Sequence, residues 1–341
     1  MSGGPGGDRD EDRPPAQTAR KHVEHCMGTV FSFDLREPYP VEGALEEAVR
    51  SLHRVDATFS TYRPDSDISR LARGEVGVGD CAPEVGEILA LCERLTEETD
   101  GCFSAYPGGA LDPSGVVKGW AIERAAGILR AAGSLNHHVN GGGDIRLTGG
   151  PEPGRPWRVG IADPLRPGTV ATVVAGRDMA VATSGTAERG AHILDPRTGR
   201  PVAGGLASVT VVGPSLTLAD AYATAAFVMG EAARDWIEGL PGYEAYGIGL
   251  DGRTWTTTGL RADGPAQPST GPGPGRPARS SGPAQFTVGF GGPVRFAVGS
   301  GGRVRFAVGS GGPAQPSARS GRSTMSTRSA MDAATRWGRN G

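Results

Sequence analysis

The chain has 341 residues, enough for one large domain or two small ones, and its formal net charge of −2 argues against a general nucleic-acid-binding protein. The charge is unevenly distributed, because residues 264–341 carry ten Arg and a single Asp, a net of +9, which leaves −11 for residues 1–263. The four cysteines form no metal-binding spacing and are typical of reduced thiols in a cytosolic protein. The polar N-terminus lacks the apolar core of a signal peptide and no stretch is long enough to cross a bilayer, so we expect a cytoplasmic protein without a membrane anchor.

Composition divides the chain into three parts. Residues 1–20 are polar and are expected to be disordered, residues 21–262 carry the hydrophobic periodicity of a folded domain, and residues 263–341 form a low-complexity tail rich in Gly, Pro and Arg. A ten-residue step in the tail separates Phe286, Phe296 and Phe306, but short glycine-broken units cannot form a core, so we expect the tail to be disordered. Its Arg residues could give weak contact with RNA or other anions, although a solvated extension is the simpler interpretation.

Hydrophobic periodicity and turn residues predict the elements of the folded part. Strand patterns cover residues 23–35, 137–148 in two pieces around three glycines, 157–162, 170–175, 179–183, 206–212, 245–250 and 254–258. Helical patterns cover residues 41–59, 83–99, 116–132, 214–230 and 231–239, and Ser114 is the expected cap of the helix at 116–132. A further short helix is expected to be capped by Ser66 or Asp67 and to end near Gly74. Residues 184–201 are expected to form a long polar loop. This irregular alternation favours an α+β fold over a doubly wound parallel sheet.

The helix at residues 214–230 contains one carboxylate, Asp220, among small and apolar residues, and the hydroxyl of Thr224 follows one turn later on the same face. The Ala residues of this helix would let neighbouring backbones approach closely. A buried carboxylate is costly without a partner, and no Lys or Arg lies within a turn, so the partner is either a side chain from elsewhere or a metal ion. Alternatively, Asp220 lies near the first turn and only favours the helix dipole.

Three loops contain residues that suit catalysis or ligand binding. Residues 112–119 open a helix and could bind an anion through free N–H groups beside Lys118, or could be an ordinary capped helix start. The glycines within residues 140–144 need a close backbone approach, either to another element or to a flat ligand. Residues 185–199 combine His192 with Asp, Arg and Thr, which suits proton transfer or anion binding, whereas the Asp-Pro-Arg-Thr-Gly end also makes an ordinary β-turn.

Widespread nucleotide-binding and hydrolase motifs, such as a Walker A loop or a G-x-S-x-G elbow, are absent from the sequence. The order of the motifs that are present is distinctive: Met27-Gly28-Thr29, Phe59 to Arg70, Asp112 to Gly119, the Gly141–Asp144 turn, Ala182 to Gly185, His192 to Gly199, and Ala219-Asp220-Ala221 with Thr224. From about Val23 to Leu260, this succession resembles the ApbE family, the FAD:protein FMN transferases.

The resemblance implies an α+β fold with two antiparallel-sheet and helix subdomains of the T-fold-like type and an active site between them; the disordered tail expected from composition follows this domain. It also implies Mg²⁺-dependent transfer of FMN from FAD to a Thr or Ser hydroxyl of an acceptor protein through a phosphoester bond, with release of AMP. The alternatives are a Mg²⁺-dependent FAD pyrophosphatase that yields FMN and AMP, or a protein that holds FAD without turnover. No nucleic acid is expected as a partner.

The resemblance further assigns site residues. His192 is implied as the base that takes the proton from the acceptor hydroxyl. The implied metal ligands are Asp220, Thr224 and the carbonyl of Gly115, with Ala223 near the ion. The residues implied to contact FAD are Met27, Tyr62, Cys102, Phe103, Ser104, Asp112, Lys118, Ser184 and Ile193. The chain departs from the family pattern at Ser104, where the family has Asp, and at Pro113-Ser114, where it has Leu-Gly.

Overall fold

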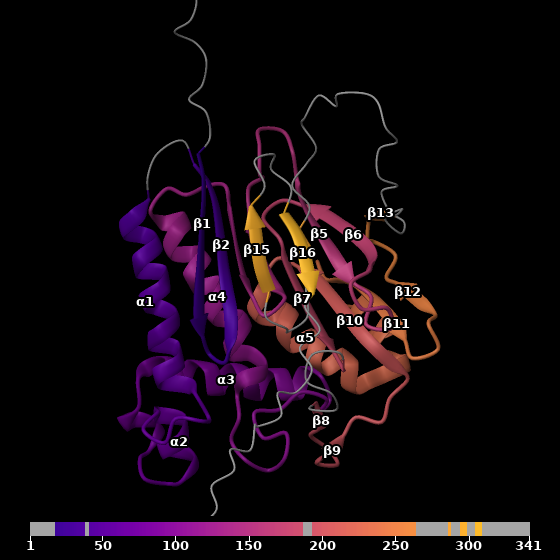
Figure 1. The fold of residues 1–341 in the computed structure, drawn as a ribbon. Coiled ribbons are helices and arrows are strands. Elements are labelled where there is room, and N and C mark those ends of the chain that lie inside the picture. The colour runs from indigo at the N-terminus through magenta and orange to yellow at the C-terminus, as the bar shows by residue number, and fades with distance from the viewer. Residues whose placement is uncertain are drawn as a thin grey trace, which may run out of the picture.

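An eight-stranded antiparallel sheet forms the centre of the computed structural model, which describes residues 18–37, 41–186 and 193–263 and three short strands beyond them (Figure 1). The strands follow the order β1-β2-β3-β4-β7-β10-β11-β12. Their bounds are β1 Thr18–Cys26, β2 Thr29–Glu37, β3 His137–Gly141, β4 Asp144–Thr148, β7 Ala180–Gly185, β10 Leu206–Gly213, β11 Glu244–Gly249 and β12 Thr254–Thr256.

The sheet consists of two halves of similar construction. β1 to β4 form the first half, β7 and β10 to β12 form the second, and β4 joins β7 between them. Helix α4 (Ser114–Ala131) packs on β3 and β4, whereas α5 (Leu216–Met229) packs on β7 and β10. The two helices also pack against each other, and α1 (Glu42–Phe59) packs against α4. The predicted α+β fold of two antiparallel-sheet and helix units is therefore confirmed, with the two sheets continuous.

A second sheet covers the face of the large sheet opposite the helices. It contains β13 (Ala262–Asp263), β6 (Val170–Gly176), β5 (Trp157–Ala162) and β14 (Phe286–Thr287), in that order. Trp157 and Val159 of β5 share a buried cluster with Val181 of β7, while the neighbouring Ala180 and Ala182 belong to the core on the helix side. Adjacent residues of β7 thus face opposite cores, as the alternation of a strand requires.

The other described helices lie outside the α4 and α5 pair. They are α2 (Asp67–Ala72), α3 (Pro83–Glu98) and α6 (Ala233–Glu238), with short 3-10 turns η1 (Val78–Asp80) and η2 (Gly230–Ala232). Most predicted helices and strands are present with ends within a few residues of those expected. Of the two residues predicted as the N-cap of α2, Ser66 or Asp67, the cap is Ser66, because its side chain accepts a hydrogen bond from Ser69 N–H.

Two small hairpins lie where no regular structure was predicted. β8 (Leu194–Asp195) pairs with β9 (Arg200–Pro201) inside the segment predicted to be an irregular loop. β15 (Val294–Val298) pairs with β16 (Val304–Val308), and these strands, like β14, belong to the tail for which the sequence predicted disorder. The repeated Val-Arg-Phe-Ala-Val units have the period of two that suits a strand. The other residues of the tail, and residues 1–17, lie outside the described part.

Two local predictions were wrong. The single strand expected at residues 23–35 is a hairpin of β1 and β2 that turns at Met27 and Gly28, with φ angles of 51° and 68°. Both angles are in the left-handed region that a two-residue hairpin turn needs, and Met in place of the usual Asn or Gly hid the turn in the sequence. Ser114 is the first residue of α4 and not its cap; Asp112 Oδ1 accepts a hydrogen bond from Ser114 N at 3.0 Å.

The contact between α4 and α5 depends on small residues. Gly119 on α4 lies so close to α5 that a Cβ atom would be 2.6 Å from Leu216 O and 2.9 Å from Asp220 Cβ. Glu123, one turn further along α4, holds the start of α5, because its Oε2 accepts a hydrogen bond from Ser215 Oγ at 2.8 Å. The predicted close approach along α5 is also confirmed by its fully buried alanines, Ala219, Ala221, Ala223, Ala225 and Ala226.

Two adjacent histidines of β3 are buried. His137 is 0% exposed and His138 is 5% exposed. Ser134 Oγ lies 3.0 Å from His137 Nδ1, and the His138 ring packs edge-on against Trp157 with ring centroids 5.0 Å apart. Burial lowers the pKa of each imidazole from 6.5 to about 4. Both rings are therefore neutral in the folded protein at neutral pH.

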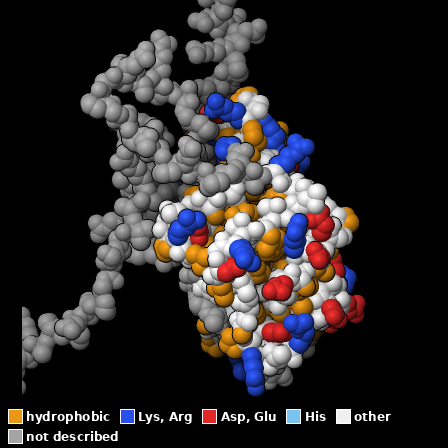
Figure 2. Space-filling model, turned by 90° about the vertical axis from the view of Figure 1, so that its right-hand side faces the viewer, with side chains coloured by type: hydrophobic (Ala, Val, Ile, Leu, Met, Phe, Trp, Pro, Cys, Tyr) orange, Lys and Arg blue, Asp and Glu red, His pale blue; other side chains and the backbone are white. Residues whose placement is uncertain are grey.

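The surface carries charges of both signs. On the face that Figure 2 shows, side chains of Lys and Arg and side chains of Asp and Glu are both exposed. The four cysteines, all within the described residues, form no disulfide. None of the helices in the described part of the chain has the length and apolar character needed to span a bilayer.

We expect Gly119→Ala to lower the free energy of unfolding by about 1–3 kcal/mol, because the added methyl group has no room between α4 and α5. Gly127→Ala on the same helix is the matched control. No neighbouring atom lies within 4 Å of its added Cβ, so helix propensity should raise the free energy of unfolding by about 0.5–1 kcal/mol. Urea unfolding of both variants measures the two effects, and shifts of equal sign and size would contradict the close helix contact.

We also expect the free energy of unfolding to fall as the pH drops from about 7 to 5. The folded pKa values of His137 and His138, about 4, lie below the unfolded value of 6.5, so in this window the unfolded chain binds more protons and gains stability. Each histidine should account for a loss on the order of 1–2 kcal/mol at pH 5.

Urea unfolding at both pH values tests this linkage. His138→Gln should flatten the pH dependence, whereas His25→Gln, at an exposed histidine of β1, should leave it unchanged. If the two variants showed the same pH dependence as the unmodified protein, the buried histidines would not be the cause.

Candidate active site

A cavity of about 880 Å³ opens where the two halves of the fold meet. The first turn of α4, the middle of α5 and strand β7 form its floor, and the β1–β2 turn, the loop after α1 and the β8 strand contribute to its rim. Because α4 comes from the first half and α5 from the second, the cavity lies at the junction where the sequence placed the active site.

The cavity collects nearly all of the residues predicted for the site. Those that line it are Met27, Tyr62, Cys102, Phe103, Ser104, Asp112, Gly115, Lys118, Ser184, Ile193, Asp220 and Thr224. Ala223 is fully buried in the core and does not line the cavity. His192, the predicted base, lies outside the described residues. The roles of these residues remain predictions, but twelve residues from distant parts of the chain lie around one space.

Asp220 is the buried centre of the site. Its side chain is 5% exposed, its Oδ2 accepts a hydrogen bond from Gly119 N at 3.0 Å, and its Oδ1 lies 3.6 Å from Lys118 Nζ. Burial raises the pKa of the Asp220 carboxyl above its ordinary value; the nearby Lys118 opposes this shift and Asp144 adds to it. The side-chain partner that the sequence left open is thus Lys118 from α4. A burial this deep does not fit a carboxylate that only favours the helix dipole.

Asp144 is a site residue that the sequence analysis did not assign. It is 1% exposed, its Oδ1 accepts a hydrogen bond from Thr183 N at 3.0 Å, and its Oδ2 lies 2.6 Å from Lys118 Nζ. The Gly-Gly-Gly run before it was the available signal. Of the two interpretations of that run, approach to another element holds at Gly142, whose added Cβ would be 2.8 Å from Thr29 Oγ1, and Gly142 also lines the cavity.

Lys118 therefore has protein partners on two sides. Its position in the first turns of α4 opposes the helix dipole, and the sequence was compatible with either a bound anion or an ordinary capped helix start with an exposed Lys. The two buried carboxylates give a second explanation that needs no ligand. At the start of α4, Asp112 Oδ1 accepts a hydrogen bond from the Ser114 N–H and the Pro113 carbonyl accepts those of Val116 and Val117, which leaves the N–H of Gly115 to offer an anion.

The oxygen atoms around Asp220 suit a hard divalent cation. Thr224 Oγ1 lies 3.3 Å from Ser184 Oγ on the cavity wall, one turn after Asp220. Gly115 lines the same cavity, packed so tightly on Phe103 that a Cβ would be 3.0 Å from the ring. A carboxylate, a hydroxyl and a backbone carbonyl are all oxygen ligands, as Mg²⁺ prefers. Among the described residues, no group of three or more His, Cys, Asp or Glu side chains could hold a metal ion.

The other side of the cavity carries apolar and aromatic surface. Tyr62 is 95% exposed at the rim, whereas Phe103 is only 2% exposed in the wall. Ser104, which stands where the family has Asp, uses its Oγ to accept a hydrogen bond from Tyr106 N at 3.0 Å. Asp56 on α1, which the sequence analysis did not single out, is a carboxylate that also lines the cavity.

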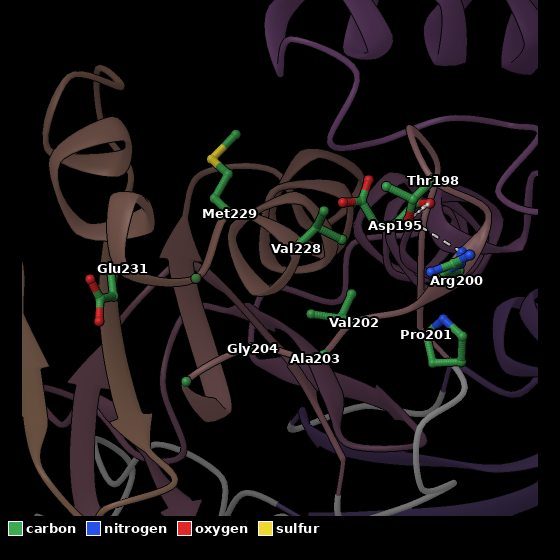
Figure 3. A pocket seen from close by; sticks show the side chains of 12 residues that line it. Asp195, Thr198, Arg200, Pro201, Val202, Ala203, Gly204, Val228, Met229 and Glu231 are labelled. Carbon is green, nitrogen blue, oxygen red and sulfur yellow. Dashed lines mark hydrogen bonds between the residues drawn. The ribbon is translucent and has the colours of Figure 1, made fainter.

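A second cavity, of about 810 Å³, lies on the other side of the β8–β9 hairpin (Figure 3). Asp195, Thr198 and Arg200 of the hairpin face Val228 and Met229 at the end of α5 across it. Of the predicted site residues that the structure describes, none lines this second cavity. The hairpin separates the two cavities, because its Leu194 and Pro196 line the first one.

Comparison with known proteins adds independent evidence. A model of the ApbE family matches residues 27–110 and 104–247. The FAD:protein FMN transferase of Vibrio cholerae is 38% identical over 148 residues, which cover 41% of this chain and 44% of the relative. The FAD:protein FMN transferase of Haemophilus influenzae is 35% identical over 250 residues, which cover 54% of this chain and 72% of the relative. The matched part thus spans about half of the first relative and most of the second.

Solved structures share the fold. The ApbE protein of Thermotoga maritima aligns with a TM-score of 0.62 at 23% identity, over 71% of this chain and 97% of that protein. The flavin transferase ApbE of Vibrio cholerae aligns with a TM-score of 0.61 at 24% identity, over 71% of this chain and 98% of that protein. The family match covers both α4 and α5 and so contains the cavity between them. On these grounds the chain belongs to the ApbE family.

Proposed function

We propose that this chain is an FAD:protein FMN transferase. It transfers FMN from FAD to a Thr or Ser hydroxyl of an acceptor protein in a Mg²⁺-dependent reaction and releases AMP. The observation that carries the proposal is that Asp220, Thr224, Gly115 and Lys118 line one cavity in a member of the ApbE family whose curated relatives bear that name. Four thiols without a disulfide suit a reducing compartment, and we infer that the reaction takes place in the cytoplasm.

Asp220, Thr224 and the carbonyl of Gly115 would hold Mg²⁺. Bound there, the ion would supply positive charge to the pyrophosphate of FAD as negative charge develops on the leaving group. A ligand set with one carboxylate and two neutral oxygens leaves much of the ion's charge for the phosphate oxygens. The ammonium of Lys118 and the N–H of Gly115 at the start of α4 would bind the same pyrophosphate from the protein side.

The aromatic rim and wall would hold the flavin. Tyr62 exposes nearly its whole side chain, and a flat ring stacked on it would remove that apolar surface from water. Met27 lies at the β1–β2 turn beside the same opening, and Phe103 forms part of the wall. These contacts would position the isoalloxazine so that the pyrophosphate lies over the start of α4.

In the transfer step, the acceptor oxygen attacks the phosphorus on the FMN side of the pyrophosphate. The new O–P bond forms while the P–O bond to AMP breaks, so that FAD and the hydroxyl give a phosphoester and AMP. The hydroxyl proton passes to a base, a role that we assign to His192 on the family resemblance alone. With water in place of the acceptor, the same step gives FMN and AMP.

Asp220→Asn should lower FMN transfer about 100-fold or more, because it removes the charge that would hold the ion but keeps an oxygen for the Gly119 N–H. Asp178→Asn is the matched control: Asp178 does not line the cavity, its Oδ1 accepts a hydrogen bond from Gly149 N at 3.2 Å, and the variant should keep full activity. The acceptor is the protein that becomes covalently flavinylated when the chain is co-expressed with its genomic neighbours.

The assay combines FAD, MgCl₂ and that acceptor, followed by in-gel flavin fluorescence after denaturing electrophoresis. Undiminished labelling by Asp220→Asn would rule out the metal assignment. Release of FMN without a labelled acceptor would favour the pyrophosphatase, and a yellow protein without turnover would favour a binding protein.

His192→Ala should lower the transfer rate roughly 10²–10⁴-fold, as expected for the loss of a general base, while the affinity for FAD changes little. Flavin fluorescence titration measures the affinity, and the gel assay measures the rate. His53→Ala, at an exposed histidine of α1, serves as the control and should change neither quantity. Equal losses of rate and affinity in His192→Ala would assign His192 to binding instead.

A further inference from the structure

Two buried carboxylates share one ammonium group in the floor of the cavity. Lys118 Nζ lies 2.6 Å from Asp144 Oδ2 and 3.6 Å from Asp220 Oδ1. The carboxylate side chains are 1% and 5% exposed, whereas the Lys118 side chain is 31% exposed. Lys118 and Asp220 both line the cavity, and Lys118 is the most exposed member of the group.

The two carboxylates hold Lys118 unequally. Asp144 is fixed on β4 by the hydrogen bond from Thr183 N–H at 3.0 Å, and it makes the short contact with the ammonium. Asp220 is fixed on α5 by the Gly119 N–H, and its contact with the ammonium is about 1 Å longer. Asp144 therefore holds the ammonium more closely than Asp220 does.

The choice of Lys at this position is unusual for this chain. Of its 35 basic residues only two are Lys, Lys21 and Lys118, and all the others are Arg. A lysine ammonium is a compact charge on a flexible stem, which can move between partners, whereas an arginine side chain is larger and binds carboxylates through a planar fork. Lys21 pairs with the buried Asp34 at 3.7 Å, outside the residues that line the cavity.

We propose that Lys118 is a built-in counter-cation of Asp220 that gives way when a divalent cation binds, and that Asp144 is the positioning residue that keeps the displaced ammonium in the cavity. This inference rests on the proposed metal ligands, Asp220, Thr224 and Gly115. Two cations cannot share Asp220 without repulsion, so the lysine weakens metal binding until an anion takes up its charge. The pyrophosphate of FAD supplies that anion, and the affinities for Mg²⁺ and FAD therefore rise together.

The test measures the affinity of the FAD-free protein for MgCl₂ by isothermal titration calorimetry. Lys118→Met removes the competing cation and should raise the affinity about tenfold, within the usual range of coupling between charged sites. Lys21→Met removes the other lysine together with its ion pair to a buried carboxylate and should leave the affinity unchanged. An affinity of Lys118→Met equal to or below that of the unmodified protein overturns the proposal.

Asp144→Asn separates a positioning role from a general charge effect. In the unmodified background it should lower Mg²⁺ affinity several-fold, because Lys118 then pairs with Asp220 alone, while the amide oxygen still accepts the hydrogen bond from Thr183. In the Lys118→Met background it should change the affinity less than twofold, because no ammonium is left to redirect. Equal losses in both backgrounds would show that Asp144 acts only through its own charge, and the proposal would fail.

The same measurements distinguish a failure of the counter-cation proposal from a failure of the proposed metal site. If the unmodified protein and Lys118→Met bind Mg²⁺ equally well, the counter-cation is wrong and the metal assignment survives. If Lys118→Met binds Mg²⁺ and its Asp220→Asn derivative does not, the ion occupies the proposed site. If neither Lys118→Met nor the unmodified protein binds Mg²⁺ with or without FAD, both the metal assignment and the counter-cation are wrong.

Discussion

The burial of Asp220 at the contact between α4 and α5 is the constraint on which the site depends. A carboxylate removed from water needs partners, and it finds them in the Gly119 N–H and the Lys118 ammonium, both from the other helix. The two halves of the fold must therefore meet in one register for this charge to be tolerated. Gly119, which has no room for a side chain, makes that register available, and Glu123 holds the start of α5 in place.

The close contact between α4 and α5 also forms the candidate active site. The helices approach closely because α5 is lined with alanine, and their approach places the start of α4 beside the middle of α5. Gly115, the Lys118 ammonium and the Asp220 carboxylate then line one cavity, and an aromatic rim completes it. The chemistry of phosphoryl transfer consists largely of positioning and charge neutralisation, and these are the properties that the contact supplies.

Sequence patterns predicted the elements and singled out Asp220, because an isolated carboxylate in an apolar helix is visible in a single stretch. The partner Lys118 precedes Asp220 by about a hundred residues, and no local pattern pairs two helices that belong to different halves of a sheet. Asp144 was missed for the same reason, since its burial depends on Thr183 and Lys118. The turn at Met27 was not predicted because Met rarely adopts a left-handed backbone conformation. Most residues of the candidate site were predicted from the order of motifs along the chain, because that order identifies the family and hydrophobic periodicity does not.

A crystal structure of the protein with FAD and Mg²⁺ bound tests the account most directly. The account predicts an ion coordinated at about 2.1 Å by an Asp220 carboxylate oxygen, the Thr224 hydroxyl and the Gly115 carbonyl, with the pyrophosphate beside it. It also predicts that Lys118 Nζ has left Asp220 for a phosphate oxygen while it remains in contact with Asp144. An ion bound elsewhere, or FAD bound while the Lys118 and Asp220 pair stays intact and no ion touches Asp220, would contradict it.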